Sequence, residues 1–305
     1  MSVAVGKDAK KQCCASCGIA GNDDITLKDC SACHLVKYCS VNCQKDHRPQ
    51  HRKECKKRVA ELRDEILFKQ PESSHLGDCP ICYLPLPLDR SKSCLYSCCS
   101  KHICVGCDHA NKKREAERRL EQRCAFCRTD LPKTMEEVNE QMMRRIEAND
   151  PIAMCYMGSK RCKEGDYKSA FEYFTQAAAL GDGAAHYQLS MMYYNGIGVE
   201  KDQRRELYHT EQAAIGGHPK ARQNLVCLEG ENDQHNRAVK HLIIAAKLGY
   251  DKSLEHAKAL YKAGLVSKED FAVALRGHQA AIDATKSPQR EEAYLMDFIR
   301  VVNEE

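Results

Sequence analysis

The cysteines are the residues of this sequence best able to do chemistry, because most of them come in closely spaced pairs. Seventeen of the 20 cysteines lie in residues 1–127, and three lie in the rest of the chain. Two residues between a pair let a tight turn aim both thiolates at one ion, and three residues place both ligands on one helical face. In a reducing compartment this pattern indicates metal ligands rather than disulfides. We therefore expect zinc sites in the first half of the chain.

Four ligand pairs in residues 13–55 supply two complete tetrahedral sites. Their order, with the string YCSVNCQKDHRPQHRKEC, resembles the MYND zinc finger. Such fingers bind proline-containing peptides with the help of an aromatic residue before the ligand histidine, and Arg48 stands at that position here. We expect Cys13 and His47 to be non-ligands. The resemblance implies two interleaved zinc sites, one of Cys14, Cys17, Cys39 and Cys43, and the other of Cys30, Cys33, His51 and Cys55.

A second cysteine-rich segment, residues 78–133, contains three clear pairs with two residues between the cysteines. The order of these pairs, with a cysteine-rich loop before the second and a helix before the third, resembles a RING finger. Usual RING fingers carry a histidine three residues before the fifth cysteine, where this chain has Lys101. All-cysteine variants place a cysteine five residues before it, which favours Cys99 with Cys98 as its partner; Cys94 and His102 are the alternatives. The resemblance implies one zinc on Cys79, Cys82, Cys104 and Cys107, and another on Cys124 and Cys127 together with the third pair, for which we favour Cys98 and Cys99.

All four predicted zinc sites have four protein ligands, so the ions are structural and leave no open position for a reactive water. The RING resemblance implies a ubiquitin ligase without catalytic residues of its own, which orients a charged ubiquitin-conjugating enzyme. Two residues match positions that contact this enzyme in that family, Ile81 and Arg128; Ala125 replaces the usual proline after the seventh ligand, and Phe126 keeps an apolar surface there. In the alternative, Ile81 and Phe126 only cover zinc, Arg128 is a solvated surface charge, and the RING-like fold serves for docking.

The remaining segments supply the elements that position these residues. We expect a disordered N-terminus at 1–12, a helix and linker at 56–77, and a mixed-charge helix at about 111–122 inside the second finger. Thr134 and Glu137 form a capping-box start for the helices that follow. Residues 287–305 should form a final capping helix over the open end of the helical stack, with Pro288 at its first position.

Residues 134–286 contain an internal repeat. Ala-Ala-x-x-Gly recurs at Ala177, Ala213 and Ala245, at intervals that indicate a solenoid of stacked helix pairs. The best copy, AAHYQLSMMYYNGIGVEKD, resembles the Sel-1-like repeat, a relative of the tetratricopeptide repeat. This part contains no catalytic motif, and we expect its histidines and its cysteines, Cys155, Cys162 and Cys227, to be structural. Its expected function is a concave face that binds another protein.

The predicted fold class is therefore two small zinc-stabilised α+β fingers, MYND-like and RING-like, followed by an all-α helical-repeat solenoid. The mean hydropathy of −0.59 and the lack of a long apolar run predict a soluble chain without membrane association. The N-terminal residues lack a signal-peptide pattern, which predicts a cytoplasmic or nuclear location. Fifteen thiolates and four Zn²⁺ would change the formal charge from +4 to −3, which disfavours nucleic acid as a partner.

Two functions follow from these expectations. The first is a protein-protein interaction adaptor, in which the helical repeats hold a client while the RING-like finger acts as a ubiquitin ligase. The alternative is a non-catalytic nuclear co-regulator or scaffold that docks partner proteins through its MYND-like finger. The sequence leaves open the client, the conjugating enzyme and the oligomeric state.

Overall fold

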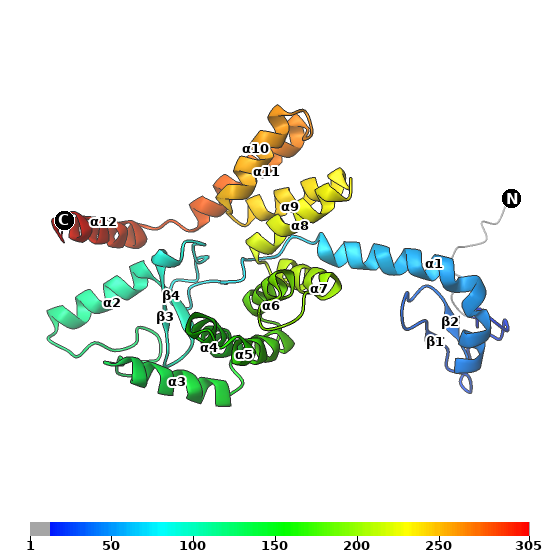
Figure 1. Cartoon of the computed structure of the whole chain (residues 1–305), viewed down its shortest axis with the longest axis horizontal. Helices are drawn as coiled ribbons and strands as arrows, with labels where there is room; N and C mark the ends of the chain where they lie inside the picture. The colour runs from blue at the N-terminus through cyan, green and yellow to red at the C-terminus, as the bar shows by residue number, and fades with distance from the viewer. Residues whose placement is uncertain (1–12, 305) are drawn as a thin grey trace. The chain divides into compact units, whose positions relative to one another are not determined.

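The computed structural model describes residues 13–304, with side chains described as far as residue 296 (Figure 1). The expected disorder of residues 1–12 lies outside the described residues. The chain forms two compact units, Met1–Lys69 and Gln70–Glu305, and each is described by itself. No helix within residues 13–304 combines the length and the apolar character needed to cross a membrane.

The first unit contains a short antiparallel pair of strands and one long helix. Strand β1, Lys28–Asp29, pairs with β2, Lys37–Tyr38. Helix α1, Val41–Leu67, begins after Ser40, whose side chain accepts a hydrogen bond from the backbone N–H of Cys43. The sequence predicted only the second half of this helix, which begins earlier than expected and has Pro49 inside it although proline usually interrupts a helix.

The second unit begins with the second finger, residues 78–133. A 3₁₀ turn, η2 at Arg90–Lys92, leads into an antiparallel hairpin of β3, Ser93–Tyr96, and β4, Lys101–Cys104. Helix α2, Val105–Glu117, follows β4 directly because the sulfur of Cys104 caps its start. It therefore begins and ends earlier than the helix predicted at about 111–122.

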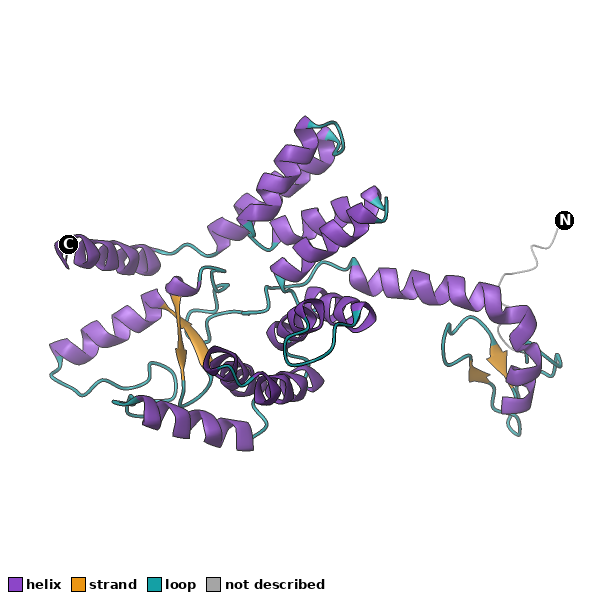
Figure 2. Cartoon of the chain, viewed as in Figure 1, coloured by secondary structure: helices purple, strands orange, loops and turns teal. Residues whose placement is uncertain are grey.

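The rest of the second unit is a stack of helices (Figure 2). Thr134 caps the first of them by accepting a hydrogen bond from the backbone N–H of Glu137, which confirms the predicted helix start. Helices next to each other in the sequence pack against each other along most of the stack. The helices are α3 Met135–Glu147, α4 Pro151–Glu164, α5 Tyr167–Ala179, α6 Gly183–Asn195, α7 Gln203–Ile215, α8 Pro219–Glu231, α9 His235–Lys247, α10 Asp251–Lys262 and α11 Lys268–Ala284.

Small residues set the spacing of this stack. The paired alanines at Ala177, Ala213 and Ala245 are fully buried, so neighbouring helices approach closely at these points. Gly183 lies against the backbone of Gly216, where an added Cβ would come within 3.1 Å of the carbonyl oxygen. The repeat pattern of the sequence therefore reflects helix packing.

The second finger packs against the helical stack, so the predicted segments 78–133 and 134–286 belong to one compact unit. Leu95 of β3 packs against the core around Met142 and Met157. The linker before the finger also contacts the stack: the backbone N–H of His75 donates to the carbonyl oxygen of Gly217 over 3.1 Å.

The last helix, α12 Pro288–Glu304, differs from its prediction. It packs against α2 of the second finger instead of covering the open end of the stack (Figure 1). Its anchor is Arg290, a fully buried cation that lies against Gly106 at the start of α2. The predicted position over the end of the stack is therefore wrong, because polar contacts that no local pattern marks hold this helix on the second finger.

Candidate functional site: metal centres and a basic cavity

The first finger brings eight ligand atoms into two groups. Within each group all ligand atoms lie within 4.8 Å of one another. The sulfurs of Cys17 and Cys39 are 3.6 Å apart, and His51 places Nε2 3.1 Å from the sulfur of Cys33. The groups contain the residues that the MYND resemblance implied: Cys14, Cys17, Cys39 and Cys43, and separately Cys30, Cys33, His51 and Cys55.

These distances fit a tetrahedral zinc ion. Four Zn–S bonds of about 2.3 Å in a tetrahedron separate the sulfurs by about 3.8 Å, whereas a disulfide brings them to about 2.05 Å. The sulfur separations in the first finger, 3.6 Å for Cys39 and Cys43 and 4.0 Å for Cys30 and Cys55, match the first arrangement. With four protein ligands, a bound zinc would stabilise the fold and activate no water.

The second finger also brings its cysteines into two groups of four. The sulfurs of Cys82 and Cys104 are 3.8 Å apart, as are those of Cys99 and Cys124. The groups have the composition that the RING resemblance implied: Cys79, Cys82, Cys104 and Cys107, and separately Cys98, Cys99, Cys124 and Cys127.

The hairpin determines which cysteines reach the second of these groups. Cys98 and Cys99 lie in the turn between β3 and β4, next to Ser100 with its positive φ of 52°. The alternative ligands lie on the strands themselves. The sulfur of Cys94 is 3.9 Å from a carboxylate oxygen of Asp108, and His102 lines a cavity that is formed by the finger and the helical stack together.

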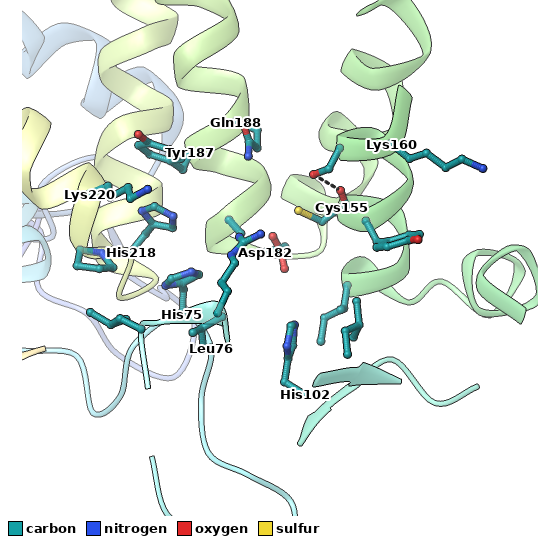
Figure 3. A pocket seen from close by; sticks show the side chains of 18 of the residues that line it. His75, Leu76, His102, Cys155, Lys160, Asp182, Tyr187, Gln188, His218 and Lys220 are labelled. Carbon is teal, nitrogen blue, oxygen red and sulfur yellow. Dashed lines mark hydrogen bonds between the residues drawn. The ribbon is translucent and has the colours of Figure 1, made fainter. Parts of the chain in front are cut away.

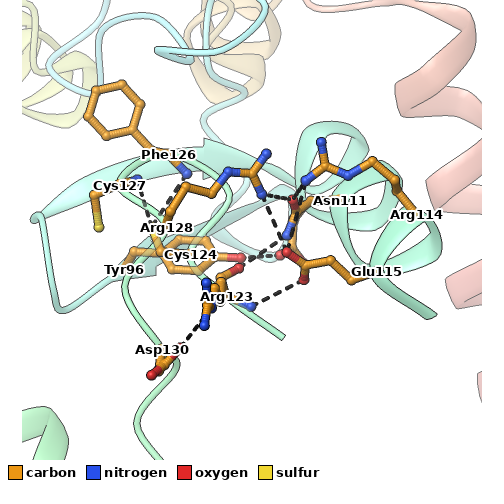
Figure 4. Close-up of polar contacts among 11 residues, drawn as sticks. Tyr96, Asn111, Arg114, Glu115, Arg123, Cys124, Phe126, Cys127, Arg128 and Asp130 are labelled. Carbon is orange, nitrogen blue, oxygen red and sulfur yellow. Dashed lines mark hydrogen bonds and ion pairs between the residues drawn. The ribbon is translucent and has the colours of Figure 1, made fainter. Parts of the chain in front are cut away.

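The three residues predicted to contact a conjugating enzyme remain partly exposed. The exposed fractions are 37% for Ile81 and 44% for Phe126. Arg128 is held by its own finger: its guanidinium donates to the Asn111 side chain over 2.7 Å and pairs with buried Glu115 at 3.3 Å (Figure 4). Arg128 therefore has a fixed orientation, unlike a freely solvated charge.

Arg290 is a further residue beside a metal group, and the sequence did not predict it. Its guanidinium donates to the carbonyl oxygens of Leu84 and Pro85 over 3.1 and 2.7 Å, and lies 3.4 Å from the sulfur of Cys82. A cation at this distance stabilises a thiolate. No local motif marks Arg290, because its partners on the finger lie more than 200 positions away in the sequence.

A cavity of about 780 Å³ lies within the second unit (Figure 3). The linker and the second finger contribute His75, Arg90 and His102. The helical stack contributes residues of the first helix of successive pairs: Cys155, Tyr156, Ser159, Lys160 and Lys163 of α4; Ala184, Tyr187 and Gln188 of α6; and Pro219 and Lys220 of α8.

Burial and positive charge perturb the titratable groups of this cavity. Burial, with a contribution from Arg90, lowers the pKa of His75 to about 4. Burial and nearby His75 lower the pKa of His218, whose ring lies 4.2 Å from that of His75. Burial raises the pKa of the Cys155 thiol. At neutral pH the histidines are therefore uncharged and the thiol is protonated.

Two families of known proteins match parts of the chain. The MYND finger matches residues 14–55, and the Sel1 repeat matches residues 152–182, 183–218 and 228–250. These matches confirm both resemblances and the fold class, a small zinc-binding cysteine-rich N-terminal region followed by a helical Sel1-repeat solenoid. Neither match reaches residues 79–127, so the RING-like resemblance stays a prediction.

Individual proteins that are similar to this chain have low sequence identity to it. The chain is 25% identical over 198 residues to "DAP3-binding cell death enhancer 1" of Mus musculus, and 24% identical over 205 residues to the protein of that name in Rattus norvegicus. The matches cover 52% and 53% of this chain but only 39% and 40% of the relatives. A solved Sel1 repeat protein from Oxalobacter formigenes is 27% identical, with 51% of this chain and 67% of that chain covered and a TM-score of 0.44.

Proposed function

We propose that this protein is an adaptor that holds a partner protein on the face of its Sel1 repeats that lines the cavity. A zinc finger combined with Sel1 repeats suggests a protein-interaction adaptor. The observation that supports this face is the cavity itself, because polar and aromatic side chains from α4, α6 and α8 converge there. Pockets of about 300–1,000 Å³ are typical of small-molecule sites, so a cavity of this size can enclose a few side chains of a partner's segment.

Site-specific photo-crosslinking in cells tests the adaptor proposal. A photoreactive amino acid replaces Gln188 inside the cavity, and in a matched control it replaces Lys258, an exposed residue of α10. We expect a protein that crosslinks at Gln188 but not at Lys258, and that binds the purified chain. Identical crosslinking patterns at both positions would contradict a partner on this face.

The name of the two mammalian relatives supplies a first candidate partner, DAP3. We propose to measure binding of purified DAP3 to the full chain by calorimetry. We expect binding that the crosslinker at Gln188 captures. If DAP3 fails to bind while another protein is captured, this candidate is wrong and the adaptor proposal stands.

We further infer that the chain binds four structural zinc ions. The donor sets and sulfur separations of both fingers support this number. Native mass spectrometry of the reduced protein should show four ions in the wild type and in Cys94→Ser, but fewer in Cys99→Ser. A count of two ions in the wild type would show that the second finger is not a zinc module.

A second candidate function is ubiquitin ligase activity through the second finger. The exposed apolar residues Ile81 and Phe126, together with oriented Arg128, favour it. In a ubiquitin-discharge assay with several conjugating enzymes, Arg128→Ala should slow discharge, whereas Arg118→Ala, which changes an exposed arginine at the end of α2, should not. Equal rates for the wild type and Arg128→Ala would exclude this function.

A further inference from the structure

The lining of the cavity carries an excess of positive charge. Its cations are Arg90, Lys160, Lys163 and Lys220, and its one carboxylate is Asp182. Lys160 lies 3.7 Å from Glu164, whereas the other three cations form no ion pair with the side chains that the structure describes. Three positive charges are therefore available to an occupant of the cavity.

The carboxylate of Asp182 does not neutralise this charge, because the protein already uses it. Asp182 is the N-cap of α6, and its side chain accepts a hydrogen bond of 2.6 Å from the backbone N–H of Ala185. Burial raises the pKa of this carboxyl group.

Helix starts add to the positive potential. The first residues of α4, α6 and α8 contribute to the lining through Ile152, Ala184 and Pro219. The N-terminus of a helix carries a partial positive charge of about half a unit, and this favours anions within the first turn. The capping carboxylates Asp150 and Asp182 partly neutralise the starts of α4 and α6, whereas the start of α8 is capped by uncharged His218 and adds in full to the three unpaired cations.

The aromatic side chains of the cavity favour carboxylates over nucleotide bases. The rings of Tyr187 and His218 stack on each other with centroids 4.2 Å apart, and His75 packs on His218 at the same distance. Ring faces that pack against each other are not available to stack on nucleotide bases. The Nδ1 atom of His75 has no hydrogen-bond partner among the described residues, so a polar group remains unsatisfied beside the cations.

We propose that this cavity binds an acidic peptide segment of the partner protein, with its carboxylates against Arg90, Lys163 and Lys220. The proposal rests on the adaptor function and adds to it the chemistry of the recognised segment. Glutamate and aspartate side chains supply several carboxylates along an extended peptide, which suits cations contributed by separate elements. An electrostatic site of this kind weakens as salt rises.

The test is calorimetry on the full zinc-loaded chain with an acetylated and amidated (Glu-Ser)₄ peptide. The neutral (Gln-Ser)₄ peptide and an oligothymidylate of eight nucleotides are titrated in parallel. The charge variant is Arg90→Gln with Lys163→Gln and Lys220→Gln. Its matched control replaces three exposed cations elsewhere on the stack by Gln: Lys258, Lys262 and Arg276. Circular dichroism and zinc content verify that both variants are folded.

We expect the acidic peptide alone to bind, with affinity that falls as salt is raised. The charge variant should lose about tenfold or more in affinity, and the control variant should bind like the wild type. No binding of the acidic peptide, equal binding by the charge variant, or tighter binding of the oligonucleotide would each overturn the proposal. If the charge variant still crosslinks its partner at Gln188, the adaptor function stands and the acidic segment is wrong.

Discussion

Replacement of Arg290 by Ala should release α12 from the second finger. Arg290 is fully buried, and its guanidinium is the polar contact between the start of α12 and the loop after Cys82. Two of its hydrogen bonds cross this interface, to the carbonyl oxygens of Leu84 and Pro85. The variant removes both bonds and leaves the carbonyl oxygen of Pro85 without this donor, whereas that of Leu84 keeps its bond from the backbone N–H of Cys79.

The magnitude follows from these bonds. A hydrogen bond that involves a charged group contributes about 1.5–3 kcal/mol, and an abandoned buried acceptor costs a similar amount. Two bonds therefore give about 3–6 kcal/mol, and entry of water into the vacated space places the expected loss near the lower value, about 3 kcal/mol. Arg290→Lys keeps the charge but lacks the planar fork that reaches two acceptors at once, so about half of the loss should remain.

Native-state hydrogen exchange is the assay, because it reports local opening of α12 and α2. A loss of about 3 kcal/mol corresponds to an increase of about 100-fold in exchange for amides that open with this contact. The control is Arg276→Ala, which removes an exposed arginine on α11. If α12 and α2 exchange at the wild-type rate in Arg290→Ala, then Arg290 does not anchor the helix and the reasoning fails.

Three further predictions concern the helical stack and the metal groups. Gly158→Ala should lower the free energy of unfolding by about 1–3 kcal/mol, because the new Cβ would lie 2.7 Å from the ring of buried Phe174; an unchanged melting temperature would count against tight packing there. His241 is fully buried beside Arg222, and burial lowers its pKa to about 3 from 6.5, so the unfolded chain takes up a proton first as the pH falls. His241 should therefore lower the free energy of unfolding between pH 6.5 and pH 3 by up to about 1.4 kcal/mol per pH unit, and His241→Gln should reduce the slope of the protein by this amount in denaturant titrations. Chelation of zinc under reducing conditions should unfold both fingers and leave the repeat helices folded, so that circular dichroism retains most of its helical signal; complete loss of that signal would contradict this view.

The metal-ligand groups could be predicted from the sequence because the two ligands of each pair lie close together in the chain. Each pair lies within one tight turn or one helical turn, so its spacing indicates that both side chains meet one ion. Family resemblance then supplied the combination of pairs, which spacing alone leaves open. The structure groups the same residues, including Cys98 and Cys99, where the deciding feature is the turn of a hairpin.

The repeats were accessible for a related reason. Paired alanines and glycines recur where neighbouring helices approach each other. The residues that form the sequence pattern, such as the buried Ala177, Ala213 and Ala245, are therefore the ones that allow the helices to pack closely. Element ends were harder to predict. Helix α1 continues through Pro49, and α2 starts at a cap made by the Cys104 sulfur, and neither effect belongs to general propensity rules.

Such sequence patterns could not predict the position of α12. Its apolar residues suggested a lid on the stack, but a helix with an apolar stripe can pack on any apolar surface. The position of α12 depends on Arg290 and on Gly106. A Cβ atom added at Gly106 would lie only 3.0 Å from the backbone of Arg290, so the glycine allows this close approach. Such a contact joins residues far apart in the sequence, and it becomes visible only when the chain is folded.

Zinc and partner binding are connected through the hairpin of the second finger. Strand β4 carries His102, which lines the cavity, and ends at Cys104, which belongs to a metal group. On the finger side, the cavity therefore consists of residues whose positions depend on the metal groups, since a finger of this size has too small an apolar core to hold its shape alone. The helical stack supplies the opposite side and most of the cations. A structural metal can thus be necessary for binding without contacting the bound segment.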